Sequence, residues 1–215
     1  MARTADHEGR RRQVAEALMR TVADRGLART TLADVADEAG VSVGLVQRYF
    51  RTKSDLLRFG VRHMYQRAEE RFRAIDGKGT YRELLYRFAE TLLPLDDERR
   101  LELTVWLEFL PATLTDPEMA RLHQDTTAAL VAGIAHGFED AARRGDLPEG
   151  IDARGEATRL VAFVDGLTLH HLVTTREFPA EEIRDSLRTY LDRLRTAPGS
   201  PDHASEHHEG DRHDQ

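Results

Sequence analysis

Residues 30–57 read TTLADVADEAGVSVGLVQRYFRTKSDLL, a pattern that predicts two short helices joined by a tight turn. Thr30 or Thr31 can cap the first helix, and the apolar residues that follow recur at the spacing of one helical face: Leu32, Val35, Ala36 and Ala39. Gly40 comes directly after this stripe and can take the left-handed conformation that ends a helix. Ser42 can then cap a second helix. Two helices joined by a short turn that contains glycine are typical of a helix-turn-helix.

The second helix has one face free for a partner. If Val46 and Phe50 point into the core, four residues must point outward: Val43, Gly44, Gln47 and Arg48. Glutamine can pair with adenine and arginine with guanine, and an α-helix fits the major groove of DNA. Gly44 has no side chain, so the backbone can approach the bases closely. We therefore predict that this face reads base edges.

Residues beside this face are suited to the phosphate backbone. Tyr49 and Lys53 offer a hydroxyl and an ammonium, which hold phosphates without reading sequence. With the two helix caps, the complete set of predicted DNA-binding residues is Thr31, Ser42, Val43, Gly44, Gln47, Arg48, Tyr49 and Lys53. The alternative is an amphipathic helix pair in another kind of helical protein, with Gln47 and Arg48 as ordinary solvated residues.

Residues 10–57 resemble the N-terminal DNA-binding domain of the TetR family of transcriptional regulators. The matching residues are Thr30, Thr31, Val35, Ala36, Ala39, Gly40, Val41, Ser42, Tyr49, Phe50, Lys53 and Leu56. Two positions depart from the family pattern: Ala33 stands where many members carry a DNA-contacting basic or polar residue, and Gln47 where many carry tyrosine. The resemblance implies a homodimer that binds double-stranded DNA at a palindromic operator, with its recognition helices about 34 Å apart.

Composition argues against several other classes of protein. The 215 residues include no cysteine, so no disulfide, thiolate metal site or cysteine nucleophile can form. No apolar run approaches the roughly 20 residues of a membrane span, and no leader opens the chain, so we expect a cytoplasmic protein. The sequence has no glycine-rich phosphate loop, GxSxG turn or HExxH metal motif. An enzyme or helical ligand carrier is the weaker alternative, and we expect neither a cofactor nor a metal.

The net charge of −7 is unevenly distributed. Residues 1–55 hold ten basic and eight acidic residues, which gives +2, whereas the remainder holds 21 basic and 30 acidic residues, which gives −9. This asymmetry suits a protein that binds DNA with one end and is repelled from it at the other.

The whole chain is predicted to be all-α. Residues 1–9 lack periodicity and are predicted to form a flexible arm, which either binds DNA through its arginines or is simply solvated. Residues 10–55 are predicted to form a three-helix domain, and residues 56–196 a larger helical domain. The resemblance implies that this larger domain binds a ligand and dimerises. Residues 197–215 are polar and predicted to be disordered. The resemblance implies that the last two helices of the larger domain form the dimer interface.

The resemblance also implies a pocket for a small-molecule effector in the larger domain. The candidate walls are Phe88, Trp106, Phe109, Phe138 and Phe163, and the candidate polar residues are Glu108, His123, His136, Asp165 and His170. The alternative for each aromatic residue is an ordinary place in the core. The segments VWLEF at 105–109 and GDLP at 145–148 are similar to the subgroup that includes the choline-responsive betaine regulators, and an aromatic and carboxylate lining would suit a cation. An activator, or a regulator without a ligand, would share these features.

Overall fold

In a computed structural model, the chain is helical across the residues that the structure describes, 2–194, with side chains described from residue 7 onward. The elements are α1 (Ala2–Arg25), α2 (Leu32–Glu38), α3 (Val43–Tyr49), α4 (Lys53–Arg73), α5 (Tyr81–Glu90), α6 (Asp97–Phe109), a short 3-10 helix (Leu110–Leu114), α7 (Pro117–Arg144), α8 (Ala153–Val173) and α9 (Ala180–Leu194). No strand occurs within these residues, so the predicted all-α fold is confirmed.

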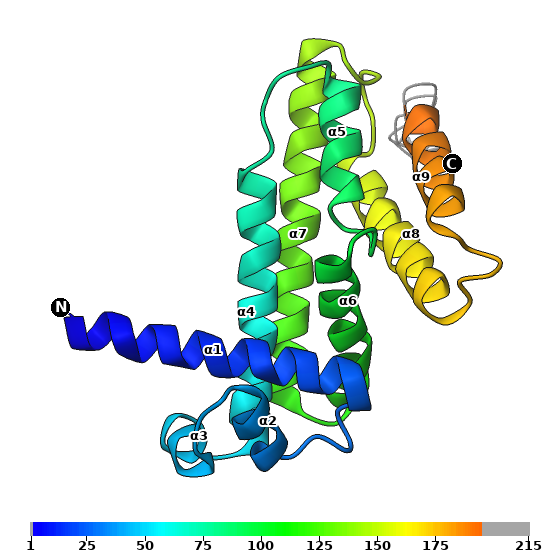
Figure 1. Cartoon of the computed structure of the whole chain (residues 1–215). Helices are drawn as coiled ribbons and strands as arrows, with labels where there is room; N and C mark the ends of the chain where they lie inside the picture. The colour runs from blue at the N-terminus through cyan, green and yellow to red at the C-terminus, as the bar shows by residue number, and fades with distance from the viewer. Residues whose placement is uncertain (1, 195–215) are drawn as a thin grey trace, which may run out of the picture.

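The helices form an elongated body with a small head at one end (Figure 1). The head consists of α1, α2 and α3, and α1 packs across α4 and α6. Within the body, α4 and α7 run side by side, α5 lies toward the far end, and α8 and α9 cover one side. Because α4 starts in the head and continues along the body, it connects the two parts directly.

Caps explain where several helices begin and stop. Thr31 and Thr52 cap α2 and α4 in capping boxes, in which the hydroxyl and a carboxylate each accept a backbone N–H from the other residue. Asp116 caps the first turn of α7. Gly40 and Gly145, which follow α2 and α7, have left-handed φ values of 64° and 81°. The predicted start of α2 at Thr31 and its predicted end at Gly40 are therefore confirmed.

The prediction of a flexible arm over residues 1–9 is wrong for residues 2–9, because α1 begins at Ala2. The first turns of α1 project from the body (Figure 1). A projecting part of a helix buries no face and therefore needs no apolar stripe. The imidazole of His7 packs edge-on against the ring of Tyr49, with ring centroids 4.6 Å apart, and so connects this extension to α3. The predicted tail, 197–215, lies outside the described residues.

Two hydrophobic cores hold the molecule together. The first contains buried residues of α1 to α4 together with Val105, Phe109 and Met119 from α6 and α7. The second joins α5, α7, α8 and α9. The predicted domain boundary after residue 55 falls inside α4, and the first core extends across it. The head and the base of the body therefore share one core.

Candidate functional site

The outward face of α3 has the orientation that the sequence predicts. Val46 and Phe50 are buried, and their burial turns the opposite side of the helix to solvent. The exposed residues on that side are Val43, Gly44, Gln47 and Arg48. Ser42 starts the helix, because its hydroxyl oxygen accepts the backbone N–H of Leu45 at 3.2 Å. The four residues therefore form one accessible surface on a short, capped helix.

Three further predicted DNA-binding residues lie at the end of this helix or beside it. Thr31 is exposed, and its hydroxyl donates to the Asp34 carboxylate at 2.6 Å while accepting the Asp34 backbone N–H at 3.2 Å. These hydrogen bonds lower the pKa of Asp34. Tyr49 is half-buried at the end of α3. The ammonium of Lys53 donates to the backbone carbonyl of Leu27 at 2.6 Å, a contact that the sequence did not predict.

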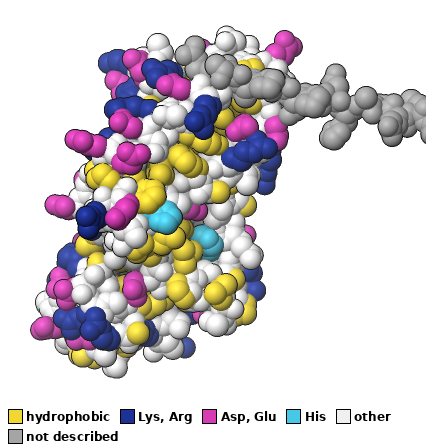
Figure 2. Space-filling view, turned by 90° about the vertical axis from the view of Figure 1, so that its right-hand side faces the viewer, with side chains coloured by type: hydrophobic (Ala, Val, Ile, Leu, Met, Phe, Trp, Pro, Cys, Tyr) yellow, Lys and Arg dark blue, Asp and Glu magenta, His cyan; other side chains and the backbone are white. Residues whose placement is uncertain are grey.

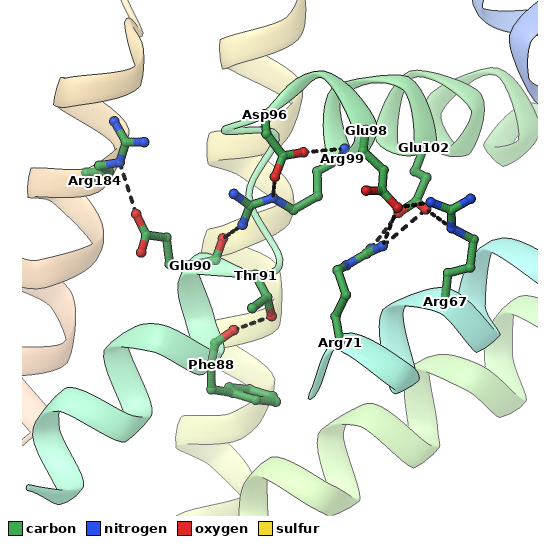
Figure 3. A network of polar contacts seen from close by, with 10 residues as sticks. All are labelled: Arg67, Arg71, Phe88, Glu90, Thr91, Asp96, Glu98, Arg99, Glu102 and Arg184. Carbon is green, nitrogen blue, oxygen red and sulfur yellow. Dashed lines mark hydrogen bonds and ion pairs between the residues drawn. The ribbon is translucent and has the colours of Figure 1, made fainter. Parts of the chain in front are cut away.

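A network of four charged side chains joins α4 to α6 (Figure 3). Glu102 is 3% exposed, and its two carboxylate oxygens accept hydrogen bonds from Arg71 at 3.1 and 2.5 Å. Arg67 contacts the Glu102 carboxylate at 2.9 Å and also pairs with the more exposed Glu98. Because the carboxylate of Glu102 is buried, its charge requires both guanidinium partners. This network was not predicted from the sequence, although each helix carries two like charges four residues apart, which places them on one face.

Four of the body's aromatic residues come together where α4, α6 and α7 meet. The Tyr65 hydroxyl and Nδ1 of His123 are hydrogen-bonded at 3.0 Å. The rings of Trp106 and Phe109 lie 6.4 and 6.1 Å from the His123 ring, measured between centroids. Burial lowers the pKa of His123, which favours the neutral imidazole. We call Tyr65, Trp106, Phe109 and His123 the aromatic cluster. Tyr65 was not predicted, although it lies one helical turn from Val61 on the apolar side of α4.

A carboxylate from α8, that of Asp165, acts on the aromatic cluster through its charge. Burial of Tyr65 and, secondarily, the charge of Asp165 raise the pKa of the Tyr65 phenol, so this carboxylate acts on the aromatic cluster electrostatically. Although Asp165 retains exposed surface, protein atoms around its carboxylate desolvate it and raise its pKa to about 6. It makes no hydrogen bond or ion pair with the described residues. Asp165 is therefore a charged group without a counter-ion in this part of the chain.

The other predicted aromatic residues lie away from the aromatic cluster. Phe88 of α5 packs on Phe72, with ring centroids 4.7 Å apart. Phe138 is 1% exposed and belongs to the second core. Phe163 stacks on Tyr190 at 4.7 Å, where α8 meets α9. Helical spacing places all three on apolar faces, but it does not reveal which apolar face borders a ligand site.

The other predicted polar residues also lie elsewhere. Glu108 accepts the backbone N–H of Leu27 at 2.8 Å, at the base of the head. His136 is exposed on α7, beside two acidic residues of the same helix. His170 is exposed near the end of α8, where its ring stacks on Phe178 with centroids 4.6 Å apart. Of the predicted ligand residues, the structure brings together Trp106, Phe109 and His123, and the charge of Asp165 acts on Tyr65 beside them.

No helix in the described part of the chain is both long enough and apolar enough to cross a membrane.

Family models match both parts of the chain. Residues 15–58 match the bacterial regulatory proteins of the tetR family. Residues 81–196 match the C-terminal domain of BetI-type transcriptional repressors. The head and the body therefore carry the signatures of one kind of protein.

Individual relatives agree with these models. The chain is 28% identical to the transcriptional regulator PksA of Bacillus subtilis (strain 168), over 90% of this chain and 94% of that one. It is 31% identical to the transcriptional regulator BetI of Stenotrophomonas maltophilia (strain R551-3), over 85% and 91% of the two chains. A Saccharomonospora viridis transcriptional regulator, solved in complex with choline, superposes with a TM-score of 0.78 at 27% identity, over 85% of this chain and 95% of that one.

These matches cover most of the chain and account for both the exposed α3 face and the helical body. TetR regulators are not enzymes, and their helix-turn-helix binds DNA. The chain is therefore a DNA-binding transcriptional regulator that belongs to the TetR family, with a C-terminal domain of the BetI type.

Proposed function

We propose that this regulator is a homodimeric repressor that binds a palindromic operator and releases it when choline, or a similar quaternary ammonium compound, binds beside the aromatic cluster. The observation that carries the proposal is the packing of that cluster, together with the unpaired carboxylate of Asp165, which acts electrostatically on its Tyr65. An activator, or a regulator without an effector, would use the same head and is the alternative.

In the proposed DNA complex, α3 enters the major groove. Val43, Gly44, Gln47 and Arg48 read base edges, and their joint exposure supports this role. The groups that contact phosphates are Thr31, Ser42, Tyr49 and Lys53, which lie around that face.

The proposed dimer forms through α8 and α9. Figure 2 shows hydrophobic side chains gathered across the face of the molecule that carries these helices. On α8, Leu169 is 41% exposed and Val173 is 62% exposed. Large apolar side chains exposed together on a single chain favour burial against a second copy. A twofold axis through this face would present two copies of α3 to two half-sites.

The proposed ligand is a cation because of the groups that surround the site. Trp106 and Tyr65 offer aromatic faces, which attract a quaternary ammonium group. Asp165 supplies negative charge, whereas neutral His123 adds no positive charge to oppose the ligand. The S. viridis regulator, solved in complex with choline, is consistent with this class of ligand. Choline must bind more tightly to the conformation that does not bind DNA, because equal affinity would shift no population.

Choline binding can be followed through Trp106, the only tryptophan of the chain. We expect choline to change its fluorescence saturably, and 3,3-dimethyl-1-butanol, the neutral isostere of choline, to bind much more weakly. Asp165→Asn should weaken choline binding about tenfold or more, because it removes the counter-ion. The matched control is Asp125→Asn, which removes an exposed carboxylate of α7 that makes no hydrogen bond or ion pair with residues 7–194. Equal affinity of the wild-type protein for both ligands would contradict the cation site.

Operator release requires a separate measurement. Fluorescence anisotropy on the intergenic DNA beside the protein's own gene should show specific binding by a dimer, relative to a scrambled duplex at fixed salt. Choline should lower that affinity, and Asp165→Asn should abolish its effect. Specific DNA binding that choline leaves unchanged would favour a regulator without this effector, and an increase would favour an effector that promotes DNA binding.

A further inference from the structure

One residue of the loop between α1 and α2 is held on both sides by distant side chains. The backbone N–H of Leu27 donates to Oε2 of Glu108, near the end of α6, at 2.8 Å. The backbone carbonyl of Leu27 accepts a hydrogen bond from Nζ of Lys53, the first residue of α4, at 2.6 Å. Glu108 lies 81 residues along the chain from Leu27, so this contact connects the body to the head.

The local backbone suits this contact. Gly26 has a φ of 80°, and a Cβ atom there would lie 3.4 Å from Oε2 of Glu108. Glycine therefore permits the left-handed turn, and the carboxylate lies at van der Waals distance from it. The Thr30 hydroxyl donates to the Gly26 carbonyl at 2.9 Å and closes the loop from the other end. The position of Leu27 is thus fixed by Glu108 and by its own loop.

Lys53 is the residue that this arrangement orients. A lysine ammonium has three N–H donors on a flexible stem, and binding a phosphate requires that stem to be ordered. The Leu27 carbonyl oxygen accepts a hydrogen bond from one of these three N–H groups, which leaves two N–H groups free to donate to another acceptor. Lys53 also lies close enough to Asp34 of α2 to lower the pKa of that carboxyl electrostatically, a smaller effect there than that of Thr31. The ammonium is therefore held at the base of the predicted DNA-binding surface.

We infer that Glu108 is a positioning residue for DNA binding: it holds Leu27, and Leu27 holds the ammonium of Lys53 ready for a phosphate. This inference rests on the phosphate role of Lys53 proposed above. Glu108 itself does not touch DNA, and its negative charge opposes the approach of the duplex. Its contribution is the hydrogen bond that it accepts, so an uncharged acceptor of the same shape preserves the function.

A double-mutant cycle without any effector tests this inference. The variants are Glu108→Ala, Glu108→Gln, Lys53→Ala and Glu108→Ala combined with Lys53→Ala, each titrated with the intergenic duplex and with a scrambled duplex of equal length. Lys53→Ala should weaken binding to both duplexes about tenfold and flatten the salt dependence, because a phosphate contact is lost. Glu108→Ala should weaken both about fivefold, less than Lys53→Ala, because the ammonium is still present but is no longer held in place. Glu108→Gln should stay within about twofold of wild type, since its amide oxygen still accepts the Leu27 N–H.

Two further measurements separate positioning from loss of structure. In the Lys53→Ala background, Glu108→Ala should have no additional effect, because the group that it positions is absent. Amide hydrogen exchange at Leu27 should accelerate in Glu108→Ala and remain slow in Glu108→Gln, with unchanged helicity and melting temperature.

Each contrary result has a defined meaning. Fully additive losses in the double variant would overturn the inference, as would unchanged DNA affinity in Glu108→Ala when Lys53→Ala weakens binding. Unchanged affinity in Lys53→Ala would refute the phosphate role itself, and the inference with it, while specific operator binding by the wild-type protein would still support the proposed regulator.

Discussion

The head and the body of this regulator acquire their candidate sites in different ways. In the head, the predicted DNA-binding residues come from one continuous stretch, 31–53, whose caps and turns are local. In the body, Tyr65, Trp106, His123 and Asp165 come from four different helices. A local site depends on hydrogen bonds within one or two helical turns, whereas a dispersed site exists only when the helices are packed. Substitutions in the two regions should therefore have different consequences.

The largest expected effect concerns the packing of α4 on α6. Glu102→Ala should lower the free energy of unfolding by about 2–3 kcal/mol, because it leaves the partly exposed guanidinium groups of Arg67 and Arg71 with only Glu98 as a partner. Chemical denaturation followed by circular dichroism measures this loss. Glu98→Ala is the matched control in the same network, and its 54% exposed side chain should contribute less than about 1 kcal/mol. Equal losses in the two variants would show that burial of Glu102 does not govern this contact.

An intermediate effect is expected on the exposed face of α3. Gln47→Ala and Arg48→Ala should each weaken operator binding by about 1–3 kcal/mol and reduce discrimination at one base pair. Both side chains are exposed, so the free energy of unfolding should hardly change. Anisotropy titrations with single-base operator variants, beside denaturation curves, would measure the two quantities. A variant with unchanged affinity and base preference would remove that residue from the reading surface.

The smallest expected effect is the pH dependence of choline binding in the body. The pKa of Asp165 is raised to about 6, so its carboxylate is mostly protonated at pH 5, and choline affinity should fall about tenfold between pH 7.5 and pH 5. Asp165→Asn should bind choline weakly with no such dependence. The effect of Asp165 on the free energy of unfolding has the opposite pH dependence to that of a salt-bridged carboxylate. The contribution of Asp165 to the free energy of unfolding should fall as the pH rises from about 4 to about 6, because the unfolded chain loses this proton first. A flat affinity profile for the wild type would argue that Asp165 does not face the ligand.

Particular residues show where prediction from the sequence succeeded. The caps Thr31 and Ser42 and the outward side of α3 were predicted and are confirmed, because each follows from spacing within a few residues. The extension of α1 to Ala2 was missed, because an apolar stripe identifies only helices with a buried face. Glu108 was predicted beside a ligand, yet its partner is Leu27, and no local pattern could reveal a contact over that sequence distance.

The sequence by itself determined the helical class, the helix-turn-helix with its exposed face on α3, and the family resemblance that the comparisons confirm. These properties depend on periodicity, capping and turn chemistry, which act over one or two helical turns. Only the tertiary structure decided that Trp106, Phe109 and His123 lie together near Tyr65 whereas Phe138 belongs to the other core. It also decided that Glu108 and Lys53 hold the same loop residue. The reason is that contacts between helices depend on crossing angles and on the axial register of each pair, which are set by the packing of the whole chain.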